Sequence, residues 1–157
     1  MSVERIPMSR DGYEKLKAKL DKMQNVDMLA VTKRIAAARE MGDLSENAEY
    51  HAAREDQGLL QASINELKDK LSRAYIIERN HDATEIVVFG SRVLVKDLNN
   101  GRQETFELVG PGDEDYENNR ILTSSPIGQG LLGKKRGEVV EIKVPRGVER
   151  FEILEIN

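Results

Sequence analysis

Two long stretches in the first half of the chain repeat apolar residues at the spacing of an α-helix. The repeat slips by one residue around Asn25-Val26-Asp27, which predicts a stutter or slight kink in the first helix. Ser9 is the expected N-cap, Asp11 complements the helix dipole, and the helix is expected to end near Met41-Gly42. Its apolar stripe recurs every three or four positions: Tyr13, Leu16, Leu20, Met23, Val31, Ile35 and Ala38.

The second stretch has a more regular repeat, with one polar interruption. Its apolar seam is typical of a coiled-coil heptad pattern. Two such helices joined by a short turn are expected to form an antiparallel hairpin with the seams facing each other. At 1.5 Å per residue, arms of roughly 30 residues predict a rod about 45 Å long. The seam positions are Tyr50, Ala53, Gln57, Leu60, Ile64, Leu67, Leu71 and Ala74.

From Glu85 onward the period of the pattern changes to two, which is typical of strands. Asn100-Gly101 and Pro145-Arg146-Gly147 are expected hairpin turns, and Ser125-Pro126 is expected to start a short helix. The pattern therefore predicts an α+β chain, with a helical hairpin over residues 1–79 and a small antiparallel sheet domain with one short helix over residues 80–157. The expected strands are 86–89, 92–95, 104–108, 139–144 and 150–156.

Composition narrows the possible functions. Of the 157 residues, 33% are charged and the net charge is -4, so the chain is unlike proteins that hold naked nucleic acid through clustered cations. There is no cysteine, which excludes disulfides and thiolate zinc sites. The start of the chain lacks the apolar run of a signal peptide, and no stretch has the roughly 18 apolar residues of a membrane span. These features predict a soluble, cytoplasmic protein with no membrane partner.

The turn between the two helical patterns carries several acids, in the segment MGDLSENAEYH at residues 41–51. One interpretation is helix capping, with Asp43 as N-cap and Glu46 three residues later. The other is metal binding, because Mg²⁺ takes one or two protein carboxylates and completes its octahedron with water and phosphate oxygens. Two carboxylates alone would bind it weakly. On this second interpretation, Asp43 and Glu46 at the tip of the hairpin, near residues 42–50, are half of a metal site.

Other polar and aromatic residues have simpler explanations. Leu44 and Ser45 are expected to shape the turn, and Tyr50 lies on the seam and is expected to pack beneath the tip. His51 and His81 have no metal-ligand spacing and are expected to be solvated. The acidic run at residues 112–119 is expected to be a solvated loop.

The segment from Ala37 to Glu55 closely resembles the hairpin tip of the bacterial Gre transcript-cleavage factor family, of the GreA type. The resemblance extends over the whole chain and includes Ile6-Pro7-Met8, Ser125-Pro126-Ile127 and Leu131-Leu132-Gly133-Lys134. Where the family commonly continues Ser-Pro-Ile with Ala-Arg, this chain has Gly128-Gln129, which removes one cation from the short helix.

The resemblance implies a specific mode of action. In that family the hairpin enters the secondary channel of bacterial RNA polymerase, and an FKBP-like C-terminal domain docks on the β′ coiled coil at the channel rim. The tip acids, here Asp43 and Glu46, help hold a second Mg²⁺ at the polymerase active site and position the attacking water. Backtracked nascent RNA is then cut near its 3′ end. The chain would therefore be a cofactor of the polymerase and not an enzyme, with Mg²⁺ bound only in the complex.

The resemblance also implies contacts beside the acids. Arg54 matches an RNA-contacting basic residue. Arg39 and Arg54 flank the tip, and Leu44 and Ser45 lie between the two acids, where RNA or polymerase would lie. For Arg39 and Arg54 an intrahelical ion pair is the alternative. Ser125, Pro126 and Ile127 are implied to contact the polymerase.

Three functions remain open at this point. The first is a transcript-cleavage factor, which the two tip acids favour. The second is a non-catalytic channel binder that blocks nucleotide entry and inhibits transcription. The third is an adaptor whose rod spaces two partners, with the tip acids serving only as helix caps.

Overall fold

A computed structural model describes residues 4–78 and 85–157, which divide into two compact units. The first unit contains residues 4–5 and 14–74, and the second contains residues 6–13, 75–78 and 85–157. The expected domain boundary after residue 79 lies outside the described residues, as does His81.

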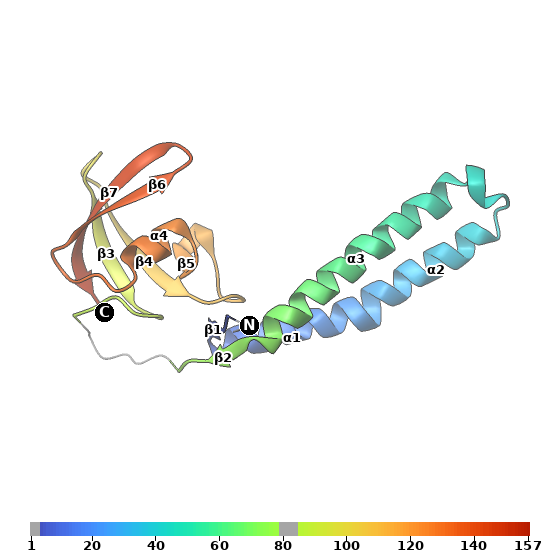
Figure 1. The fold of residues 1–157 in the computed structure, drawn as a ribbon, viewed down its shortest axis with the longest axis horizontal. Helices are drawn as coiled ribbons and strands as arrows, with labels where there is room; N and C mark the ends of the chain where they lie inside the picture. Colours follow the sequence, from blue (N-terminus) through green and yellow to red (C-terminus); the bar gives the residue numbers. More distant parts are fainter. Residues whose placement is uncertain (1–3, 79–84) are drawn as a thin grey trace. The chain divides into compact units, whose positions relative to one another are not determined.

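The first arm of the hairpin is built from α1 (Arg10–Lys22), η1 (Met23–Asp27) and α2 (Met28–Arg39). The predicted cap of α1 is confirmed, because the Gly12 N–H donates to the Ser9 hydroxyl oxygen at 2.9 Å. Figure 1 shows α1 and α2 running along α3. In α2 the helix ends at Arg39, a little before the expected end.

The predicted slip in the apolar repeat is confirmed as one π-helical turn. In η1 the Met28 N–H donates to the Met23 carbonyl oxygen, five residues back. This inserts one extra residue into the turn and rotates the following residues around the axis. As a result Val26 is 56% exposed, whereas Ile35 further along is buried. The apolar seam stays on one side of the arm despite the broken repeat.

The second arm is α3 (Ala48–Ser72), and its predicted seam is confirmed. Every seam position from Tyr50 to Ala74 is buried or half-buried, while the positions between them are mostly exposed. The fully buried layers of the hairpin come from both arms: Ile35, Ala38, Ala53, Ile64 and Leu67. Burying a large aliphatic side chain stabilises by about 1.5 to 3 kcal/mol, so these few layers hold the two helices together.

One ion pair also joins the arms near the tip. The Arg34 guanidinium lies 2.9 Å from the Asp56 carboxylate, and both side chains are about half exposed. An exposed pair of this kind contributes at most about 1 kcal/mol. The apolar seam therefore dominates the stability of the hairpin.

The second unit contains a five-stranded sheet in the order β5-β4-β3-β7-β6. All neighbouring strands are antiparallel except β4 and β5, which are parallel. The predicted turns at Asn100-Gly101 and at 145–147 are confirmed, and Gly101 has a positive φ of 76°. The strands are β3 (Arg92–Asp97), β4 (Gln103–Val109), β5 (Arg120–Leu122), β6 (Val139–Val144) and β7 (Gly147–Ile156).

Three strand predictions were incomplete. The stretch 86–89 is not a strand, and only Ile86 forms a bridge, with Lys135. The segment β5 was missed because three residues carry no measurable alternation. The two-stranded sheet of β1 (Ile6–Met8) and β2 (Ala74–Ile76) was missed for the same reason.

The core of the second unit lies between the sheet and α4 (Pro126–Leu131). Leu131 is fully buried and Ile127 packs against the same cluster. Phe106 and Phe151 meet edge to face on the sheet, with ring centroids 5.9 Å apart. The predicted class is confirmed: the chain is α+β, with a helical hairpin and a small sheet domain that carries one short helix. Among the helices of the described ranges, none has the length and apolarity needed to cross a bilayer.

The first turn of α1 packs within the second unit. Met8 is fully buried, and a Cβ added to Gly12 would lie 2.7 Å from the Pro111 carbonyl oxygen. The Ser9 hydroxyl donates to the Asp113 carboxylate, which is only 7% exposed. The expectation of a solvated acidic loop is therefore wrong for Asp113, because this carboxylate supports the residue that caps α1.

Two helical glycines offer a matched test of this packing. Gly58 in α3 has open space around it, so Gly58→Ala should raise the free energy of unfolding by about 1 kcal/mol, the usual difference in helix propensity. Gly12→Ala gains the same propensity but meets the Pro111 carbonyl, so it should lower stability. Denaturant unfolding followed by circular dichroism would measure both. Equal stabilisation by the two substitutions would show that the Gly12 contact is not tight.

Candidate functional site

The loop at the tip of the hairpin holds Asp43 in a defined conformation. Gly42 has a φ of 123°, a value that favours glycine, and Asp43 follows with an extended backbone. One carboxylate oxygen of Asp43, Oδ1, accepts from the Ser45 N–H at 3.0 Å and from the Ser45 hydroxyl at 2.8 Å. Asp43 thereby caps the single 3-10 turn η2 (Leu44–Glu46). The capping interpretation is correct in kind, but Asp43 caps this turn and not α3.

These hydrogen bonds also affect the titration of Asp43. The Ser45 N–H and then its hydroxyl hold the pKa of the Asp43 carboxyl below its ordinary value, because both bonds favour the ionised form. The side chain is exposed, so water screens but does not remove this effect. Asp43 is therefore a carboxylate at neutral pH with one oxygen already oriented. The predicted role of Ser45 in shaping the turn is confirmed.

The N-cap of α3 is Asn47, which the sequence analysis missed. Its side-chain oxygen Oδ1 accepts from the Tyr50 N–H at 3.1 Å, and its side-chain nitrogen Nδ2 donates to the Ala38 carbonyl oxygen at 2.6 Å. The signal was present, since asparagine directly before a helical repeat is among the strongest N-caps. Asp43 obscured it, because aspartate followed by Glu46 fits the capping pattern equally well.

Among the aromatic and basic residues near the tip, Tyr50 is half-buried and the others are exposed. The Arg39 guanidinium lies over the Tyr50 ring, 5.8 Å from its centroid, and Tyr50 is half-buried as expected. His51 is exposed and meets the Tyr50 ring at its edge. The Arg54 guanidinium donates to the Gln57 side chain at 3.4 Å. In the part of the chain that the structure covers, neither arginine forms the ion pair considered as the alternative to RNA contact.

Asp43 and Glu46 fit a divalent cation only as a partial ligand set. Both residues are exposed, and they lie at the two ends of the short turn η2, Asp43 as its N-cap and Glu46 as its last residue. Both Ser45 donors engage the same oxygen of Asp43, so the other oxygen, Oδ2, is available to a cation. Across residues 4–78 and 85–157 there is no group of three or more acids or histidines that could hold a metal ion. Mg²⁺ bound here would need most of its ligands from water, phosphate or another protein.

Comparison with known protein families identifies the family of this chain. The family described as "Transcription elongation factor, N-terminal" matches residues 6–76, and "Transcription elongation factor, GreA/GreB, C-term" matches residues 82–157. The chain belongs to the GreA/GreB family of transcription elongation factors. The resemblance seen in the sequence is therefore confirmed over nearly the whole chain.

Individual relatives agree in length as well as in sequence. The transcription elongation factor GreA of Thermosipho africanus is 47% identical over 157 residues, covering 100% of this chain and 99% of the relative. GreA of Thermodesulfovibrio yellowstonii is 46% identical over 154 residues, covering 98% of each. Among solved structures, the GreA factor homolog 1 of Thermus thermophilus is 26% identical, covers 98% of this chain and 99% of its own, and has a TM-score of 0.46.

In this family member, the three residues implied to dock on the polymerase surround the start of α4. The Ser125 hydroxyl donates to the Leu122 carbonyl at 2.6 Å and accepts from the Gly128 N–H at 3.0 Å, so it caps the helix. Pro126 is exposed at the first helical position, and Ile127 is half-buried. Pro126 is therefore the most accessible of the three, Ser125 and Ile127 are half-buried, and Ser125 also holds the turn in shape.

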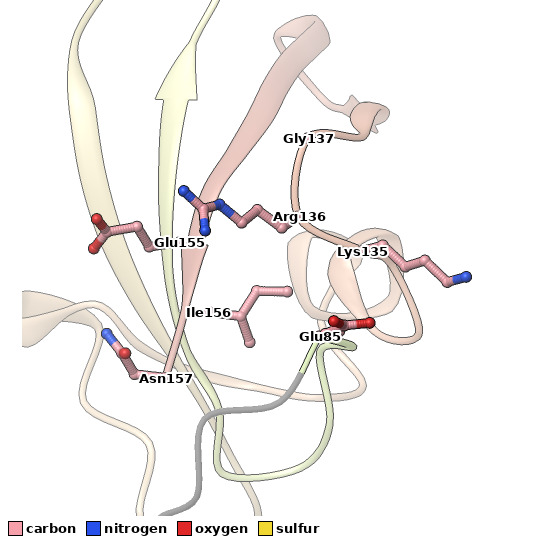
Figure 2. A pocket seen from close by; sticks show the side chains of 7 residues that line it. All are labelled: Glu85, Lys135, Arg136, Gly137, Glu155, Ile156 and Asn157. Atoms are coloured by element: carbon pink, nitrogen blue, oxygen red, sulfur yellow. The ribbon is translucent and has the colours of Figure 1, made fainter.

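A groove in the second unit is a weaker candidate site. It has a volume of about 840 Å³ and is lined by two cations, Lys135 and Arg136, and by the carboxylates of Glu85 and Glu155. In Figure 2 the Lys135 and Arg136 side chains point away from each other, so their charges do not converge on one ligand. The mixed charges favour no ligand class, and the basic turn at 134–136 is solvated.

The Ser45 hydrogen bonds predict a measurable change in the titration of Asp43. Ser45→Ala removes the hydroxyl donor but keeps the backbone N–H, so the pKa of Asp43 should rise part of the way to its ordinary value. Carboxyl carbon-13 NMR over a pH series would measure it. Ser72→Ala, at the far end of α3, is the matched control. An Asp43 pKa that is the same in Ser45→Ala and in the unsubstituted chain would contradict the geometry.

Proposed function

We propose that this chain stimulates the cleavage of backtracked nascent RNA by bacterial RNA polymerase, by carrying Asp43 and Glu46 through the secondary channel to the polymerase active site. The observation that supports this most strongly is the display of two exposed acids, one of them with an oxygen oriented by Ser45, at the end of a two-helix rod. The proposal makes the chain a cofactor of the polymerase in the bacterial cytoplasm, not an enzyme by itself.

The dimensions of the hairpin suit insertion into a narrow opening. The helix α3 has 25 residues, so it is about 37 Å long at 1.5 Å per residue. Two packed helices are about 20 Å across, and the loop between them adds little width. A globular domain could not bring carboxylates so far into another protein. The rod does so while the buried seam keeps the tip in place.

The chain's own residues would then do two things at the cleavage site. Asp43 and Glu46 would each offer carboxylate oxygens to a second Mg²⁺, and one of them would orient the attacking water. Mg²⁺ bound there would activate water and stabilise the charge that develops on the phosphate. Since the tip holds no complete ligand set of its own, RNA phosphate and polymerase acids would supply the remaining ligands.

Neighbouring residues would position the two partners. Arg54 and Arg39 would face the RNA 3′ end or the polymerase, because their positive charges suit phosphates and acidic side chains. Leu44, exposed beside Asp43, would contact the channel wall. Pro126 and Ile127 at the start of α4 would dock on the β′ coiled coil at the channel rim, with Ser125 shaping that surface.

Removing either acid should abolish the stimulated reaction. Asp43→Ala or Glu46→Ala should reduce transcript cleavage in stalled polymerase complexes by at least about 100-fold, because a missing ligand leaves the cation poorly held. Polymerase binding, measured by competition with the unsubstituted chain, should be nearly unchanged. Glu66→Ala, an exposed acid on α3 away from the tip, is the control. Full cleavage in both tip variants would refute the proposal.

Nucleotide-addition and cleavage assays distinguish the proposed function from the two remaining functions, the channel blocker and the adaptor. A channel blocker would slow nucleotide addition on complexes that have not backtracked, whereas a cleavage factor should leave that rate unchanged. An adaptor with a capped helix would keep full activity in the double variant Asp43→Asn, Glu46→Gln, because amides cap helices but bind cations poorly.

The chain alone, in Mg²⁺ without polymerase, should hydrolyse no RNA. Robust cleavage by the isolated protein would contradict its role as a cofactor.

A further inference from the structure

We infer that Asn47 is a positioning residue for the tip acids, because its side chain ties together the two ends of the loop that carries them. The inference rests on the proposed function and adds to it the residue that sets where Asp43 and Glu46 lie. Neither the tie nor its consequence follows from the capping role of Asn47 alone.

The tie joins the end of one helix to the start of the next. Asn47 Nδ2 donates to the carbonyl oxygen of Ala38, nine residues earlier, at 2.6 Å. Asp43 and Glu46 both lie between these two points. Ala38 is buried in the seam, so its carbonyl belongs to the rigid part of the rod. The loop is therefore closed at its base by a bond to a fixed atom.

The Ala38 carbonyl oxygen also accepts a hydrogen bond from the first part of the loop. The Met41 N–H donates to the Ala38 carbonyl oxygen at 3.1 Å, so the beginning and the end of the loop both donate to one acceptor. Close by, Arg39 from α2 lies over Tyr50 from α3, whose N–H is the one that Asn47 caps. The Asn47–Ala38 hydrogen bond and the Arg39–Tyr50 contact both bridge the two helices at the base of the loop.

The choice of asparagine is informative here. Serine, aspartate and asparagine cap helices about equally well, because each offers an oxygen to the free N–H groups. Only asparagine among them also carries an N–H donor that can reach a carbonyl. Capping alone would accept any of the three residues at position 47. The second bond, to Ala38, requires the amide.

The functional consequence follows from the precision that ligands require. Displacing a catalytic group by about 1 Å can cost up to about 100-fold in rate. Asp43 and Glu46 are exposed, and no seam contact holds them. Without the tie, the loop would keep its 3-10 turn, but its base could move relative to the rod. The acids would reach the active site in a wider range of positions.

Asn47→Ser tests the tie, since serine keeps the cap but is too short to reach Ala38. In stalled polymerase complexes it should lower the maximal cleavage rate at saturating protein about 10-fold or more and raise the Mg²⁺ concentration for half-maximal cleavage. The protein concentration for half-maximal effect and the thermal unfolding midpoint should not change. Asn65→Ser, an exposed asparagine further along α3, is the matched control. An unchanged rate and an unchanged Mg²⁺ midpoint would overturn the inference.

A second substitution separates the tie from the shape of the side chain. Asn47→Asp keeps the cap and the size but replaces the donor with an oxygen, so it should show the same loss as Asn47→Ser. Wild-type cleavage in Asn47→Asp would overturn the inference. Asp43→Ala, run in parallel, tests the proposed function separately. If Asp43→Ala is inactive while Asn47→Ser is fully active, the inference fails and the proposed function stands; if Asp43→Ala is active, both fail.

Discussion

The packing of α2 against α3 is the interaction on which the rest of the structure depends. A few buried layers, from Ile35 and Ala38 on one arm and Ala53, Ile64 and Leu67 on the other, hold the two helices together. The apolar repeat of the first arm slips around Asn25-Val26-Asp27, and the π-helical turn η1 at this point keeps the seam on one face. Since the seam holds the helices together, residues of the tip loop are not needed for packing. The loop can therefore carry charged residues that a core would exclude.

Local hydrogen bonds give order to this exposed loop. Ser45 fixes one oxygen of Asp43 and lowers the pKa of its carboxyl, while Asn47 fixes the base of the loop. Asp43 and Glu46 are both exposed, and the Ser45 hydrogen bonds leave the second oxygen of Asp43 available. An incomplete ligand set of this kind binds a cation weakly in water, which fits the proposal that RNA and polymerase complete the site.

Much of this arrangement could be predicted from the sequence, and the failures have physical reasons. The seam and the slip at Val26 were predictable because burial imposes a period on the sequence. The tip acids were singled out because the motif around them, which carries the family resemblance, is long and specific. Asn47 was missed as the N-cap of α3 because Asp43 followed by Glu46 fits the same capping pattern, and the sequence alone does not distinguish the two. The buried Asp113 was missed because its partner, Ser9, lies 104 residues away.

The most direct test of the central claim is to locate the cation itself. Iron(II) can replace Mg²⁺ and generate hydroxyl radicals that cut any polypeptide beside it. In stalled polymerase complexes the end-labelled chain should be cut at residues 43–46, and this cut should disappear when polymerase is omitted. Cutting elsewhere in the chain, or the same cut without polymerase, would contradict the account.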